Sequence, residues 1–117
     1  MGYNYLVDAK PRRIIFYRAT DGRQPFTEWF STLRDQVARD KIRTRLDRVE
    51  DGNFGTRRWV GEGVWELKIH QGPGYRVYFG LDGAEIVVLL CGGDKRPQDQ
   101  DIHMARTFWA DYLSRRA

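Results

Sequence analysis

The sequence predicts one α+β domain over residues 1–117, with elements in the order β-α-α-β-β-β-α. Three observations lead to this prediction. A β-rich run is followed by two stretches with helical periodicity, then by three strand-like segments, and finally by a third amphipathic stretch. The length allows one hydrophobic core and is too short for two, and no repeat or linker interrupts the order. We therefore expect a small, mainly antiparallel sheet packed against helices.

The first half of the chain contains the predicted first strand and two predicted helices. Residues 13–18 are rich in β-formers. Pro25 suits the first position of a helix, and apolar residues at helical spacing from Phe26 to Val37 predict one helix over that stretch. Residues 42–49 predict a second helix, whose alternating charges are typical of a solvated face. The glycines in residues 52–55 end it.

A hairpin follows, and its alternation separates two faces. Residues 64–70 put three apolar side chains on one side and Glu66, Lys68 and His70 on the other. Residues 71–74 form a turn, after which Arg76 and Tyr78 share a face of the next strand. We expect the apolar side to lie under the helices and the polar side to face solvent.

The last third of the chain adds a strand and a helix. Asp82-Gly83 signals a two-residue turn, and residues 85–91 are apolar on both faces, which is typical of a central strand. Residues 92–97 are interpreted as a loop. Apolar residues at helical spacing from Ile102 to Tyr112 predict the final helix, with Asp99 and Asp101 in its first turn.

Composition excludes several classes of protein. No apolar run approaches the roughly 20 residues that span a bilayer, and the first residues lack the order of a signal peptide, so we expect a cytoplasmic protein without a membrane partner. Cys91 has no cysteine to pair with, and two histidines are too few for a zinc site. No cofactor or metal is therefore expected. The net charge of +4 is a moderate indication of an anionic partner.

The strongest candidate site is the cationic side of the hairpin. Alternation groups Lys68, His70 and Arg76 there. Two further pairs are expected near them: Arg57 and Arg58 as a rim, and Lys95 and Arg96 in the loop after the last strand. Arginine suits phosphate oxygens. The alternative is a solvent-exposed sheet face with scattered cations.

Two segments resemble the RelE/HigB toxins of the RelE/ParE superfamily, in particular the phage-derived addiction-module killer protein branch. Residues 64–69 (VWELKI) and 72–80 (GPGYRVYFG) resemble the core of that family. Residues 89–95 (LLCGGDK), with Gln98 and residues 101–102, resemble its second signature. The helix that carries Phe26, Trp29 and Leu33 and residues 52–55 also agree with the family in position. The resemblance therefore covers almost the whole chain and implies a RelE-like fold.

The resemblance also implies a function and partners. Such proteins are toxins of type II toxin–antitoxin systems, typically endoribonucleases (mRNA interferases) that cut mRNA in the 70S ribosome and so inhibit translation. The implied partner is a cognate antitoxin, often with a helix-turn-helix DNA-binding domain. The family's hairpin lysine falls on Lys68, its following arginine on Arg76, and its last basic residue on Lys95 or Arg96.

Two departures from the family pattern leave the general base open. Glu66 stands where some relatives carry a second lysine, and the final helix has no early tyrosine, so Tyr78 is a candidate substitute on the hairpin face. Lys68 is either a base or purely an electrostatic stabiliser, because the Arg76 cation disfavours its charge whereas Glu66 favours it. His70 is the alternative base.

The remaining roles and functions are expectations of the same kind. Arg76 would hold the nonbridging phosphate oxygens and Lys95 would protonate the leaving oxygen, with Arg57, Arg58, Arg96 and Tyr78 binding RNA. Two other functions stay open: a ParE-like inhibitor of DNA gyrase, and a degenerate, non-enzymatic toxin acting as a binding module.

Overall fold

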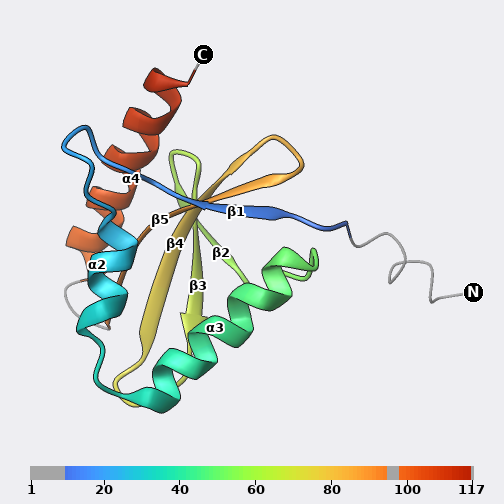
Figure 1. Ribbon diagram of the computed structural model, residues 1–117, viewed down its shortest axis with the longest axis vertical. Coiled ribbons are helices and arrows are strands. Elements are labelled where there is room, and N and C mark those ends of the chain that lie inside the picture. The colour runs from blue at the N-terminus through green and yellow to red at the C-terminus, as the bar shows by residue number, and fades with distance from the viewer. Residues whose placement is uncertain (1–9, 95–97, 117) are drawn as a thin grey trace, which may run out of the picture.

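The computed structural model of the protein describes residues 10–94 and 98–116. Within these residues, three helices and a five-stranded mixed sheet form an α+β fold (Figure 1). The elements are β1 (Arg13–Phe16), α2 (Pro25–Thr32), α3 (Gln36–Glu50), β2 (Arg58–Gly61), β3 (Val64–Ile69), β4 (Tyr75–Asp82), β5 (Ile86–Asp94) and α4 (Gln98–Arg115). The predicted α+β class is confirmed, with one additional strand, β2 (RWVG), which was not predicted from the sequence.

The sheet places β5 near its centre and the β3–β4 hairpin towards one edge. The strand order is β1-β5-β4-β3-β2. β1 runs parallel to β5, and the other pairings are antiparallel. In the hairpin, Lys68 lies opposite Arg76 and Glu66 lies opposite Tyr78. The apolar run in β5 is explained by its position, because strands pair with it on both sides and helices cover both of its faces.

The prediction of one helix from Phe26 to Val37 is wrong, because a capping residue divides the stripe. α2 ends at Thr32, and Leu33 has extended backbone angles. The Asp35 carboxylate then accepts hydrogen bonds from the backbone N–H groups of Val37 and Ala38, which starts α3. Val37 belongs to α3 and is exposed.

Two further predictions about β5 are corrected. Its expected end at residue 91 is wrong, since Gly92 and Gly93 continue the strand opposite Val77 and Arg76. Gly92 fits there because the ring of Trp29 occupies the space that a side chain would need. The turn before β5 has three residues, 83–85, because Asp82 pairs with Ile86.

Helices cover both faces of the sheet. α2 and α3 pack on the face that carries Leu67, Val77 and Phe79, and α4 packs on the opposite face over Tyr78 and Leu90. Figure 1 shows α3 running along the β3 side of the sheet, away from α4. No helix within the described ranges combines the length and apolar character needed to cross a bilayer.

Candidate nucleic-acid interface

A groove of about 750 Å³ opens beside β3, between α3, the start of β2 and the start of α4. Basic side chains from three segments line it: Arg45 and Arg48 from α3, Arg57 and Arg58 around the start of β2, and Lys68, His70 and Arg76 from the hairpin. We call this hollow the cationic groove. The structure therefore brings together most of the basic residues that the sequence singled out, and adds two from α3. Lys95 and Arg96 lie outside the described residues.

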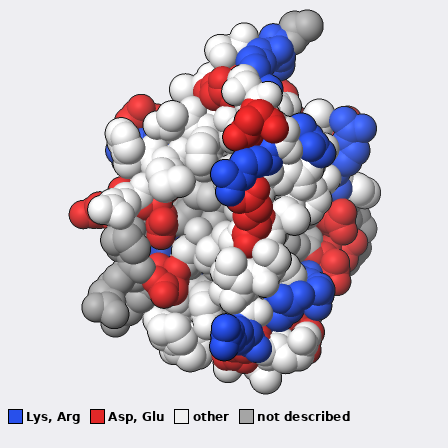
Figure 2. All heavy atoms as spheres, turned by 60° about the vertical axis from the view of Figure 1, so that its left-hand side comes forward, with Lys and Arg blue, Asp and Glu red and all other residues white. Residues whose placement is uncertain are grey.

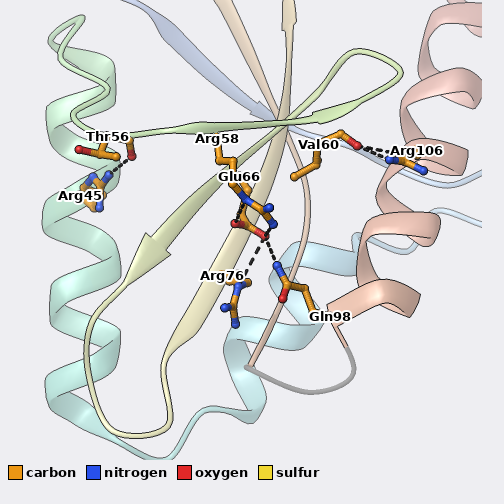
Figure 3. A network of polar contacts seen from close by, with 8 residues as sticks. All are labelled: Arg45, Thr56, Arg58, Val60, Glu66, Arg76, Gln98 and Arg106. Atoms are coloured by element: carbon orange, nitrogen blue, oxygen red, sulfur yellow. Dashed lines mark hydrogen bonds and ion pairs between the residues drawn. The ribbon is translucent and has the colours of Figure 1, made fainter.

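The groove exists because β2 is shorter than β3. β2 pairs with β3 from Val64 to Glu66, and no other strand among the described residues borders the rest of that β3 edge. Arg45 fills part of the gap: its guanidinium donates to the carbonyl oxygen of Thr56 at 2.7 Å (Figure 3) and to that of Lys68 at 3.0 Å. The expectation that the charges of this helix are simply solvated is therefore wrong for Arg45.

A buried carboxylate, Glu66, organises the floor of the groove (Figure 3). It is 3% exposed. Arg58 donates to both of its oxygens, at 3.1 and 3.3 Å, and the Gln98 amide donates at 2.9 Å. Arg76 Nε lies 3.5 Å from Oε2, an ion pair without hydrogen-bond geometry. Glu66 thus connects β2, β3, β4 and α4.

The ionised form of Glu66 is stabilised by its neighbours in this network. Burial opposes ionisation, but the hydrogen bonds from Arg58 and Gln98 outweigh it and hold the pKa of Glu66 below its usual value. The carboxylate is therefore ionised at neutral pH and faces two guanidinium groups. Glu66 orders Arg58 and Arg76. This role explains why an acidic residue stands at a position of a cationic site where some relatives carry a lysine.

This depressed pKa predicts a pH-dependent contribution to stability. A group with a lowered folded-state pKa stabilises the fold above its unfolded pKa, about 4.3 for Glu, and that contribution is lost as the pH falls through the folded value. We expect the difference in free energy of unfolding between the native protein and Glu66→Gln to be largest near pH 6 and to narrow towards pH 3. Urea titrations at several pH values measure it; a constant difference would contradict the assignment.

Three expectations about exposure are wrong, because α4 covers part of the hairpin face: Glu66, Arg76 and Tyr78 are all buried. Tyr78 is completely buried and Arg76 is only 7% exposed. The Tyr78 hydroxyl makes no hydrogen bond of standard geometry, and burial, followed by the charge of Glu66, raises its pKa. In this structure Tyr78 therefore packs within the core, without the open ring face that stacking on an RNA base requires.

The end of the hairpin that α4 leaves open carries the accessible groups. Lys68 and His70 are exposed. Lys68 is the cross-strand neighbour of Arg76, and such pairs have their Cβ atoms about 5 Å apart. Arg57 is ordered by aromatic rings, with its guanidinium 4.5 Å from the ring centre of Phe54 and 4.4 Å from that of Trp65. The groove thus combines ordered arginines with accessible proton-transfer groups.

Sequence reasoning missed Arg45, Arg48 and Gln98 as groove residues. Arg45 and Arg48 are three positions apart on α3 and so share a helix face, which is a signal in the sequence. It does not say which strand that face meets. Gln98 belongs to the second signature that resembles the toxin family, but nothing in the sequence indicated that it contacts Glu66.

Charge is distributed differently elsewhere on the molecule. Figure 2 brings forward the left-hand side of Figure 1, and there basic and acidic side chains are interspersed. Among the described residues that line the cationic groove, by contrast, the one acidic residue is Glu66, whose charge is compensated by Arg58 and Arg76. A positive concave surface of this kind attracts a polyanion.

Comparison with known proteins identifies the family of this chain. Residues 28–109 match the family described as phage derived protein Gp49-like (DUF891), a toxin–antitoxin-associated family of the RelE/HigB type. A protein of Haemophilus influenzae, itself described as uncharacterized, is 46% identical over 81 residues, which is 69% of this chain and 82% of that protein. The toxin-like character expected from the sequence is thus supported at the level of the family. This chain belongs to the Gp49-like family of phage-derived proteins.

Proposed function

We propose that the protein is the toxin of a type II toxin–antitoxin pair and an endoribonuclease that cleaves mRNA on the ribosome. The observation that carries the proposal is the cationic groove, in which exposed Lys68 and His70 lie beside an Arg76 held by Glu66. The proposed partners are mRNA, the 70S ribosome, and an antitoxin with a helix-turn-helix domain that neutralises the toxin.

The proposed reaction needs a base, an acid and stabilisation of negative charge. The ribose 2′-OH loses its proton to the base and attacks the adjacent phosphorus, and the bond to the 5′-oxygen breaks as that oxygen gains a proton. The products are a 2′,3′-cyclic phosphate and a 5′-hydroxyl end. This chemistry is within reach of side chains alone, since a positioned acid or base accelerates a reaction by about 10² to 10⁴.

The side chains are assigned to these steps by position. Arg76, whose charge is fixed and whose orientation Glu66 restrains, would hold the nonbridging oxygens. Lys68 lies opposite it and acts either as the base or as a second stabiliser of the phosphorane. His70, also exposed on this edge, is the alternative base. Protonation of the leaving oxygen by Lys95 remains an expectation from the sequence.

Expression without antitoxin tests the function. The native protein, Lys68→Met and His70→Ala are induced in separate cultures, growth is followed, and the 5′ ends of mRNA are mapped. We expect ribosome-dependent cuts with the native protein, and their loss or a fall of at least about 10²-fold when the base is removed. Arg34→Gln, which replaces an exposed arginine outside the groove, is the matched control and should cut normally.

The same cultures separate the alternative functions. DNA damage with intact mRNA would indicate a gyrase inhibitor, and normal growth with intact mRNA would indicate a non-enzymatic binding module; either result would overturn the nuclease. Co-expression of a small helix-turn-helix protein encoded beside the gene should restore growth if the proposed antitoxin is correct.

A further inference from the structure

A second hollow, of about 430 Å³, adjoins the cationic groove on the α3 side. Four residues line both hollows: Arg45, Arg48, Lys68 and His70. The hollows therefore meet along a common rim formed by the end of β3 and the adjoining face of α3. The second hollow adds Lys41 and Thr44 from the same helix.

The basic side chains on this rim differ in whether they already have hydrogen-bond partners within the protein. Arg45 is engaged by carbonyl oxygens, and Lys41 donates one hydrogen bond, at 3.3 Å, to the His70 carbonyl. Within the described residues, the side chains of Arg48, Lys68 and His70 have no hydrogen-bond or ion-pair partner. The fold thus leaves Arg48 with all of its donors available beside the two candidate catalytic residues.

Three basic residues of α3 lie in a row along one face of the helix. Lys41, Arg45 and Arg48 are spaced by four and three residues and so lie on one face of α3. Seven residues of α-helix rise about 10 Å, so the line extends well beyond a single phosphate. Asp40 also lines the second hollow at the Lys41 end, where the guanidinium of Arg43, 3.7 Å from its carboxylate, offsets its charge. We call Lys41, Thr44, Arg45 and Arg48 the α3 ledge.

We propose that the α3 ledge binds the backbone of single-stranded RNA on one side of the cleaved phosphate. The proposal rests on the proposed function and extends it: the substrate is an unpaired strand that occupies both hollows and crosses between them over Lys68 and His70. Arg48 and Lys41 contact phosphates, and Thr44 offers a hydroxyl to the same backbone. An unpaired strand fits this path because it turns over the rim freely, whereas a duplex bends only at an energetic cost.

Binding of a non-cleavable strand tests the ledge. A fluorescent 2′-O-methyl RNA 12-mer lacks the nucleophile, so its anisotropy reports affinity alone. We expect Arg48→Gln and Lys41→Met each to weaken binding by up to about fivefold at low salt. Each should also lower the slope of log affinity against log salt by about 0.7, the value for one phosphate contact on a single strand. A 12-base-pair duplex should bind more weakly than the single strand.

Matched variants make the outcomes distinct. Arg34→Gln removes the same charge outside both hollows and should change neither affinity nor slope beyond the small effect of net charge. Because Arg48 is exposed and unpartnered, its variant should keep the native melting temperature. If Arg48→Gln and Lys41→Met bind like Arg34→Gln, or if the native protein binds no single strand at low salt, the ledge is overturned.

Failure of the ledge and failure of the proposed function give different results. If the ledge variants bind the strand normally and the native protein cuts mRNA in cells, the ledge is rejected and the nuclease function stands. Weakened binding by the ledge variants, together with uncut mRNA in cells, supports the ledge as a single-strand site and rejects the nuclease.

Discussion

Glu66→Leu is expected to lower the free energy of unfolding by about 3 to 5 kcal/mol, because it removes the carboxylate with which the buried guanidinium of Arg76 is ion-paired. The side chain of Arg76 is 9% exposed and its ion pair is with Glu66. The substitution also removes the acceptor for Arg58 and Gln98. Urea denaturation at pH 7 measures the loss.

Two controls identify the buried charge as the cause. Arg58→Leu removes the partner whose side chain is 59% exposed and should cost less than Glu66→Leu, because Arg76 and Gln98 still compensate the buried carboxylate. The double variant Glu66→Leu/Arg76→Leu replaces both buried charges with apolar side chains and should recover much of the loss. If the free energy of unfolding of Glu66→Leu lies within about 1 kcal/mol of the native value, the Glu66 network does not contribute to stability as proposed.

Trp109→Ala is expected to cost about 3 to 5 kcal/mol, the usual range for removing a large buried aromatic side chain. Trp109 is 6% exposed and lies directly on the sheet: a Cβ placed on Gly80 would be 2.4 Å from its ring. It also stacks on Tyr112, with ring centres 5.4 Å apart. The indole therefore packs α4 directly against β4.

The effect of this variant should extend to the groove, since Gln98 at the start of α4 donates to Glu66. We expect Trp109→Ala, under conditions where it remains folded, to bind the single-stranded RNA 12-mer more weakly than the native protein. Met104→Ala on the same helix removes a side chain that is 46% exposed and should change stability by less than about 0.5 kcal/mol. Equal stability of the two variants would contradict the packing role of Trp109.

Much of the architecture could be predicted from local patterns. The alternation in residues 64–70 predicted a strand that matches β3, and the apolar run after Asp82-Gly83 predicted the central position of β5. The predictions failed where a local signal competed with the pattern. Asp35, for instance, caps α3 within a stripe that otherwise reads as one helix.

The candidate site was predictable only in part. Alternation states which side chains share a face of a strand, and so it placed Lys68, His70 and Arg76 together correctly. It does not state what covers that face. α4 covers one end, which buries Tyr78 and Arg76 and leaves Lys68 and His70 open.

By itself, then, the sequence determined the α+β class, the grouping of cations on one side of the hairpin, and the likeness to a toxin family. The tertiary structure alone decided the role of Glu66 and the presence of the α3 ledge. The reason is sequence separation: Glu66 meets Gln98 across 32 residues and Arg45 meets the Lys68 carbonyl across 23. Periodicity describes neighbours within one helix or strand, whereas these contacts arise only when separate elements pack together.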